Sequence, residues 1–329
     1  MSTVTQADPT GKAGSAGPLS HRRPLGDRTF AIVTAAAGLL VLVILILIVI
    51  SMTQQSTSWF SKAGFSGIFS TNWDTATNNF GAMTFLYGTV ITAVIAIIIA
   101  VPVSLGIALL LTEVVPRRWS RPFVTLIDLL AVVPSVVWGL WGIIVLVPWL
   151  ANNVYTHIAS GLTGIPVLSS LFGGTSVQGA SFFTAGLVLA IMITPIVTSL
   201  SREVIATVPA LDKEGAYALG ATRWEMIRGA VWPHSQSGIV GAVLIGLGRA
   251  MGETIAVALV VGDSPEITSH LFDSGYTMAS VIALEFGEAF DEFRSALIGL
   301  GVLLFVLTII INLLARGFVA RSGRRMRGA

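Results

Sequence analysis

The feature that most constrains this chain is a series of six long apolar stretches. A helix needs roughly 20 apolar residues to cross a bilayer core about 30 Å thick, and each stretch is close to that length or longer. The stretches are Phe30–Met52, Thr84–Leu111, Val124–Leu150, Phe183–Leu200, Gly238–Val261 and Ala296–Phe318. Of the 329 residues, 54% are hydrophobic and only 11% are charged, unlike a soluble globular protein. We therefore expect an all-α integral membrane protein with six transmembrane helices.

The two ends of the chain lie outside this pattern. Residues 1–26 are rich in Gly, Ser, Thr and Pro and show no apolar periodicity, so we expect a disordered tail. Residues 321–329 form a basic tail that is suited to contact anionic lipid. The chain has no cysteine, and its four histidines have no partner at ligand spacing. The sequence therefore predicts no disulfide and no metal site, and nucleic-acid binding is not expected.

Basic residues gather on one side of the predicted topology. Lys and Arg concentrate in the two tails and in the second and fourth connections, whereas the opposite side carries only Lys62 and Arg294. Because cytoplasmic loops collect basic residues, both termini are predicted to be cytoplasmic in a multi-pass inner-membrane protein. Acidic residues concentrate in the last external connection, which is either a solvated loop or a docking surface for an external partner.

The fourth connection, residues 208–234, carries consistent helix signals. Pro209 can open a helix, and the acidic residues Asp212 and Glu214 lie in its first turns, where the helix dipole favours them. Gly220 can close the same helix in a left-handed cap. We expect a short helix here that lies outside the membrane.

A second short helix is predicted immediately afterwards. Thr222 and Glu225 have the spacing of a capping box, and the helix is expected to run until Pro233. Such a helix pair can fit a groove on a soluble partner through apolar residues such as Leu211 and Leu219, or it can lie on lipid headgroups. The residues alone leave both readings open.

Two oppositely charged residues lie within the fifth apolar stretch, where a bilayer core is expected. Arg249 lies near the midpoint of the stretch Gly238–Val261, and an Arg at that depth costs at least ~2.5 to 3.5 kcal/mol unless it faces protein or water. Glu253, four residues later, is the nearest candidate partner if the helix is continuous. The pair is either a structural salt bridge or part of an anion pathway, in which the guanidinium offers paired donors to an oxyanion.

A proline and a serine interrupt the third apolar stretch. Pro134 and Ser135 lie inside it, and proline frees backbone groups that protein or cavity water must satisfy. Such a break either lines a path through the membrane or is a simple packing kink. Ser135 is therefore a second-rank candidate for contact with a transported anion.

Part of the fourth connection resembles the EAA signature of ABC importer permeases. The matching residues are Glu214, Gly215, Ala216, Gly220 and Pro233. The spacing is intact, but Gly215 replaces the first Ala of the signature and Trp232 its usual Leu. The resemblance implies a coupling helix, with Glu214, Gly215, Ala216 and Gly220 as the residues that dock on a cytoplasmic ATPase.

Further segments resemble the high-affinity inorganic phosphate importer permeases of the PstC type, which have a MetI-like transmembrane fold. The matching segments are residues 70–93, 100–113, 132–142, 193–205 and 249–265, and the likeness spans roughly residues 73–318. It implies a permease domain over residues 84–320, after a first transmembrane helix and an external connection over residues 27–83. It also carries over Arg249 and Glu253 as charges of a phosphate pathway.

The resemblance implies partners that the chain itself does not supply. They are a second, homologous permease subunit that forms a heterodimer, two cytoplasmic ATPase subunits, and an external phosphate-binding protein. The sequence has no phosphate loop of the G-x-x-x-x-G-K-[ST] type, so we expect the chain to be a transport subunit and not an enzyme. No cofactor is expected in this chain, and ATP and magnesium are expected in the partner ATPase.

Three other functions remain as alternatives. Within the same class, the substrate can be sulfate, molybdate or another oxyanion. Outside that class, the chain can be an ATP-independent anion transporter or channel gated by Arg249 and Glu253. A membrane scaffold without transport activity is the third alternative, and it predicts that these two charges are dispensable for phosphate uptake.

Overall fold

The computed structural model describes residues 25–161, 171–172 and 179–327. The chain divides into two compact units, one ending at Ile50 and one beginning at Ser51. The first unit holds most of α1 (Leu25–Gln55), and the remaining elements belong to the second. The predicted tail over residues 1–26 falls almost entirely outside the described residues.

The described part of the second unit is mainly helical, with one short hairpin and an irregular connection over residues 261–277. Its first elements are α2 (Thr57–Ile68), β1 (Trp73–Asp74), β2 (Asn79–Phe80) and the long helix α3 (Met83–Leu109), which continues into the π-helical segment η1 (Leu110–Val114). The next group is α4 (Arg117–Ala131), α5 (Ser135–Trp141), η2 (Gly142–Leu146), α6 (Val147–Leu150), η3 (Ala151–Tyr155), α7 (Thr156–Gly161) and α9 (Phe182–Ala206). The last group is α10 (Ala210–Ala218), α11 (Arg223–Met226), η4 (Ile227–Val231), α12 (Trp232–Gly252), α13 (Ile255–Val260), α14 (Met278–Glu285) and α15 (Asp291–Arg327).

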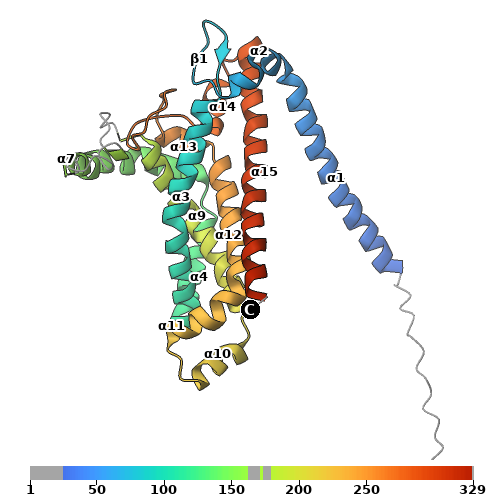
Figure 1. Ribbon diagram of the computed structural model, residues 1–329, viewed down its shortest axis with the longest axis vertical. Coiled ribbons are helices and arrows are strands. Elements are labelled where there is room, and N and C mark those ends of the chain that lie inside the picture. The colour runs from blue at the N-terminus through green and yellow to red at the C-terminus, as the bar shows by residue number, and fades with distance from the viewer. Residues whose placement is uncertain (1–24, 162–170, 173–178, 328–329) are drawn as a thin grey trace, which may run out of the picture. The chain divides into compact units, whose positions relative to one another are not determined.

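The centre of the second unit is a bundle in which α9 packs along α3 and α12 (Figure 1). Buried Phe182, Leu189 and Ile193 of α9 form the middle of its apolar core. Small residues allow the helix backbones to approach each other: a Cβ at Gly186 would lie 2.5 Å from Cγ2 of Ile95. Such close packing drives helix association in lipid, where the hydrophobic effect between helices is absent.

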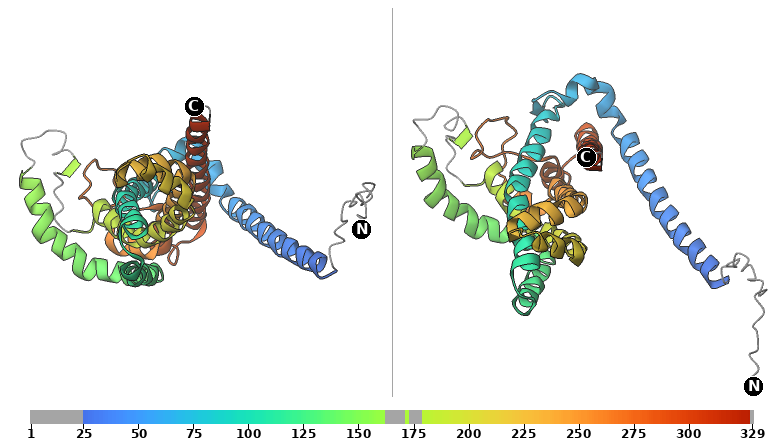
Figure 2. Two further views of the ribbon diagram at one scale, coloured as in Figure 1. Left: turned by 90° about the horizontal axis from the view of Figure 1, so that it is seen from below. Right: turned by 60° about the horizontal axis from the view of Figure 1, so that its bottom comes forward.

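The two ends of the bundle carry different elements. Figure 1 shows α2, the hairpin and α14 at one end and α10, α11 and the C-terminal part of α15 at the other. Seen along the bundle, α3, α9 and α12 group together, with α15 beside them (Figure 2). The connections predicted to be external and cytoplasmic thus lie at opposite ends, as the charge distribution requires. The predicted basic tail continues α15, whose backbone is helical to Arg327.

The six predicted membrane spans correspond only in part to helices of the structure. Among the described residues, five helices are long and apolar enough to cross a membrane. They are Arg28–Gln55, Met83–Val114, Ser135–Ile158, Phe182–Ala206 and Asp291–Gly317. The predicted stretch Gly238–Val261 is divided between α12 and α13, so it is not one continuous helix.

The third predicted stretch also differs from the structure. Val124–Leu150 was expected as a single helix, but α4 ends at Ala131 and a new helix begins at Ser135. Pro134 has an extended ψ of 139° and has no N–H to continue the ladder, so the chain turns between the two helices. The helical part of this stretch that is long and apolar enough to span a membrane runs from Ser135 to Ile158.

Near its N-terminal end, α3 approaches the Tyr276 backbone so closely at Gly88 that no side chain fits there. A Cβ at Gly88 would lie 2.0 Å from the carbonyl oxygen of Tyr276 and 2.9 Å from the Phe182 ring. We predict that Gly88→Ala lowers the free energy of unfolding by about 1 to 3 kcal/mol, because overpacking displaces backbone. The thermal unfolding midpoint of the purified protein measures this effect.

Gly106→Ala, in the same helix, is the matched control. No atom lies within 4 Å of a Cβ at Gly106, so this change is expected to be neutral or to stabilise by up to about 1 kcal/mol through helix propensity. Equal unfolding midpoints for the two variants would show that the Gly88 contact does not constrain the bundle.

Candidate functional site

The segment that carries Arg249 is interrupted one turn later. Helix α12 ends at Gly252, and Glu253 has extended backbone with φ −70° and ψ 128°. The Glu253 carboxylate then accepts a hydrogen bond from the amide of Ala256 at 3.4 Å, in the first turn of α13. Gly252 favours a helix end, and the carboxylate satisfies one amide that the new helix leaves without a partner.

This break separates the two charges that were expected to pair. The structure has two ion pairs among its described residues, Lys62–Glu292 and Lys213–Glu113, and neither includes Arg249 or Glu253. The expected i, i+4 salt bridge is therefore absent, because Glu253 no longer continues the helix of Arg249. Arg249 lies in the last turn of α12, where a cation is favoured by the helix dipole, and its side chain is exposed on the surface of the chain.

The two interrupted segments meet each other. A Cβ at Gly139 of α5 would lie 2.8 Å from Cα of Ala256, and one at Gly142 would lie 2.8 Å from Cγ1 of Val260. Because later residues of one segment contact later residues of the other, α5 and α13 run in parallel. Ser135 lies four residues before Gly139, and Glu253 lies three residues before Ala256, so both residues precede this contact in their segments.

The arrangement suits an anion better than a cation. Ser135 begins a helical segment that continues to Ile158, so the first amides and hydroxyl of that segment are donors at its positive end. Arg249 adds a guanidinium with paired donors for an oxyanion. Both residues are at least partly exposed, so the site is open on one side of the chain. At the depth that the sequence predicts for this segment, an Arg must face water, protein or an anion and not lipid.

A second candidate surface lies on α10. Gly220, after its end, has φ +82°, and its amide donates to the Tyr217 carbonyl at 2.9 Å while the Ala221 amide donates to Ala216 at 3.1 Å. This is the left-handed cap that the sequence predicts, in the Schellman form. Glycine is favoured at this position because other L-residues are strained there.

The side chains of α10 divide into two faces. Leu211 is 78% exposed and Leu219 is 91% exposed, and Glu214 and Gly215 are exposed beside them. Ala216 is half-buried and packs against a small core formed by the ends of α3, α9 and α12. Of the four expected docking residues, three are therefore on the outer surface. Ala216 instead faces the small core and holds α10 against it.

The predicted capping box is formed, but the second helix is longer than expected. Glu225 accepts hydrogen bonds from the Thr222 amide and hydroxyl at 2.8 Å each, and these bonds hold the pKa of Glu225 below its ordinary value. The helix was expected to run until Pro233, yet helical backbone continues through η4 into α12. Pro233 is tolerated because it lies in the first turn of α12, directly after the wider π-helical turn.

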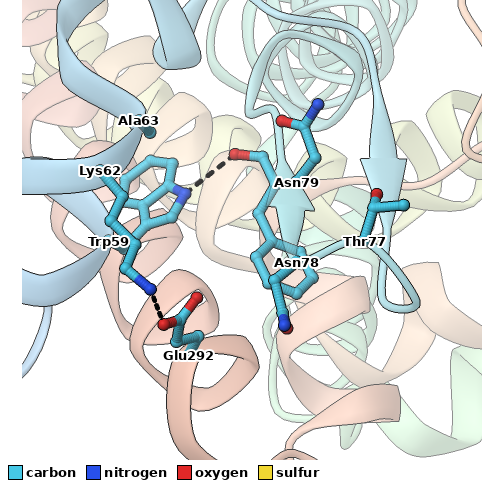
Figure 3. Close-up of a pocket in the computed structure, with 8 residues that line it drawn as sticks. Trp59, Lys62, Ala63, Thr77, Asn78, Asn79 and Glu292 are labelled. Atoms are coloured by element: carbon cyan, nitrogen blue, oxygen red, sulfur yellow. Dashed lines mark hydrogen bonds and ion pairs between the residues drawn. The ribbon is translucent and has the colours of Figure 1, made fainter.

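A pocket at the opposite end does not offer an anion site. It has a volume of about 360 Å³ and is lined by residues of α2, the hairpin and the start of α15, including Trp59, Asn78 and Asn79 (Figure 3). Its cation, Lys62, is already paired with Glu292, and the Trp59 indole donates to the Phe80 carbonyl at 2.9 Å. No group of three or more metal-ligating side chains occurs within the part of the chain that the structure describes.

The structure also reveals a pair that sequence reasoning missed. Lys213 of α10 contacts Glu113 of η1, with 2.5 Å between Nζ and Oε1. The two residues are 100 positions apart in the chain, so no local pattern connects them. The contact of Gly139 with α13 was missed for the same reason.

Comparisons with known proteins agree on one family. The sequence model of the "Binding-protein-dependent transport system inner membrane component" family matches residues 100–328. The phosphate transport system permease protein PstC of Mesorhizobium japonicum is 43% identical over 326 residues, which cover 99% of each chain. PstC of Haemophilus influenzae is 42% identical over 89% of this chain and 92% of its own length, and PstC 2 of Mycobacterium tuberculosis is 40% identical over 92% and 94%.

The likeness of this chain to solved structures is weaker than its likeness to the sequence relatives. An inward-facing structure of the MetNI methionine ABC transporter has a TM-score of 0.48 and 16% identity, with 72% of this chain and 92% of that chain covered.

The geometry of α10 yields a test that needs no partner. We predict that Gly220→Ala lowers amide protection in the last turn of α10 about five- to thirtyfold, because a left-handed Ala costs roughly 1 to 2 kcal/mol. Hydrogen exchange followed by mass spectrometry measures it. Gly215→Ala is the control: no atom lies within 4 Å of its Cβ, and protection should rise or stay unchanged. The same loss in both variants would contradict the cap.

Proposed function

Because the chain belongs to the family of binding-protein-dependent transport system inner membrane components, we propose that it is the permease subunit of an ATP-driven importer of inorganic phosphate. The relatives named for phosphate transport match it at 40–43% identity over most of its length. The structural observation that carries the proposal is Arg249, a cation inside an apolar segment without an ion-pair partner among the described residues.

The pathway charges have distinct proposed roles. Arg249 binds phosphate through two parallel hydrogen bonds, which match the planar guanidinium to two oxygens of the anion. Ser135 contributes its hydroxyl at the start of the parallel segment. Glu253, whose carboxylate is held by the Ala256 amide, fixes the turn between α12 and α13 and limits how long the anion stays.

The open side of this site supports a heterodimer. Arg249 and Gly252 are exposed, and Ile255, one residue into α13, is 47% exposed. We propose that a second, homologous permease subunit covers this face and completes a central path at bilayer depth. Phosphate reaches the path from an external binding protein.

The ATPase contact is proposed for the outer face of α10. Two cytoplasmic ATPase subunits bind ATP and magnesium, and one of them receives the exposed Leu211, Glu214 and Leu219 in a groove. Closure of the ATPases on ATP moves α10, and the bundle changes between outward- and inward-open states because ATP binds the two states with different affinity.

The charges at the two ends support the orientation. Exposed basic residues such as Arg118, Arg121 and Arg228 belong to α4 and η4, near the end that carries α10 and α11. Acidic residues Asp263 and Glu288 lie beyond α13 and α14, at the other end. We therefore place α10 and both termini on the cytoplasmic side of the membrane.

The first functional test replaces the guanidinium and keeps its charge. We predict that Arg249→Lys lowers the phosphate uptake rate of the whole importer about ten- to a hundredfold, because one charge-assisted hydrogen bond worth about 1.5 to 3 kcal/mol is lost. Uptake of labelled phosphate into proteoliposomes measures it. Arg228→Lys, in η4, is the control and should transport normally. Normal uptake by Arg249→Lys would show that only bulk charge is needed.

The second functional test addresses the outer face of α10. We predict that Leu219→Asp weakens binding of the ATPase roughly thirtyfold, because an apolar contact residue worth about 2 kcal/mol becomes charged. A quantitative pull-down of the ATPase with the purified permease measures this change. Leu284→Asp changes a 51% exposed leucine at the other end of the bundle and should bind normally. Undiminished binding by Leu219→Asp would exclude this face as the docking surface.

A further inference from the structure

The pair Lys213–Glu113 differs from the other ion pair of the described residues in its surroundings. The Lys213 side chain is 20% exposed and that of Glu113 is 8% exposed, whereas Lys62 and Glu292 are 63% and 33% exposed. A pair that is shielded from water interacts more strongly and is screened less by salt. The half-buried pair Lys213–Glu113 therefore restrains its two elements more firmly than the exposed pair Lys62–Glu292 does.

The two partners belong to elements with different tasks. Lys213 lies on the inner face of α10, opposite the exposed Leu211 and Leu219. Glu113 lies in η1, the π-helical turn that ends α3. Helix α3 runs through the bundle to Gly88, whose backbone touches Tyr276 at the other end. The pair thus joins a short peripheral helix to an element that crosses the whole unit.

Apolar packing alone does not provide the same restraint. Ala216 of α10 packs on the apolar core at this end, where its methyl group offers a small contact area, and α10 also contacts α11 and η4. A nine-residue helix such as α10 is marginal by itself, so its position depends on what holds it. The charged hydrogen bond between Lys213 and Glu113 is directional and fixes α10 relative to the end of α3.

We propose that the Lys213–Glu113 pair is the link through which a displacement of α10 reaches α3 and the membrane-spanning bundle. This inference rests on the proposed function of α10 as the ATPase-docking helix. It makes Lys213 and Glu113 positioning residues for coupling, distinct from the outward-facing residues that bind the ATPase. Breaking the pair leaves docking intact and separates ATP hydrolysis from transport.

The test compares Lys213→Met, Glu113→Lys and the swapped double variant Lys213→Glu/Glu113→Lys in the complete importer. Each single variant should bind the ATPase normally but move at least about fivefold less phosphate per ATP hydrolysed, the lower range of a typical coupling energy. The swapped pair should restore most of this ratio. The double variant Lys62→Glu/Glu292→Lys is the control for ion pairs and should leave the ratio unchanged.

Three outcomes would overturn the proposal. They are an unchanged ratio in Lys213→Met, a swapped pair no better than the single variants, and a parallel loss of ATPase binding and transport, which would indicate a purely structural role. Hydrogen exchange provides an arm that is independent of the substrate. On ATPase binding, protection at the end of α3 should change in the wild-type protein and stay constant in Lys213→Met. If the wild-type importer moves no phosphate, the proposed substrate fails while this arm still tests the link.

Discussion

A backbone amide or carbonyl that leaves a helix inside a bilayer finds no water, and this constraint governs both interrupted segments of the chain. Before Pro134, the amides of Val132 and Val133 bond carbonyls three residues back, at 3.2 and 3.3 Å, so the end of α4 is tightened instead of open. At the second break, the Glu253 amide bonds Ala250 and the Ala258 amide bonds Thr254. These amides next to the two breaks thus bond to carbonyls of the preceding turn, which lowers the free-energy cost of each interruption in an apolar environment.

Two glycines allow the helical segments that follow the two breaks to pack against each other. Gly139 and Gly142 let α5 approach the backbone of α13, and a side chain at Gly139 would meet Cα of Ala256 at 2.8 Å. A larger residue there would push α5 and α13 apart at this contact. The donors at the start of α5 and the guanidinium of Arg249 therefore depend on helix packing several residues away.

The sequence allowed the helical class, the two ends of the bundle and the local caps to be predicted. Length and hydropathy identify the spans, and the chemistry of Gly220 and Thr222 acts within a few residues, so both can be derived from local pattern. An interruption at Pro134 was also predicted, because proline has no amide, but one kinked helix was expected where the chain forms two helices. The break at Glu253 was not predicted, since Gly252 and Thr254 are both tolerated in membrane helices. Long-range pairs such as Lys213–Glu113 depend on tertiary packing, which no short window contains.

The break at Glu253 determines whether Arg249 has an ion-pair partner. In a continuous helix, Glu253 would stand one turn away and neutralise the guanidinium, and the pair would be a closed, dry salt bridge. In the structure the carboxylate bonds the Ala256 amide instead, so the guanidinium is left on an exposed face without an ion-pair partner in the described part of the chain. A cation in that condition is stable at membrane depth only if water, another subunit or a passing anion faces it.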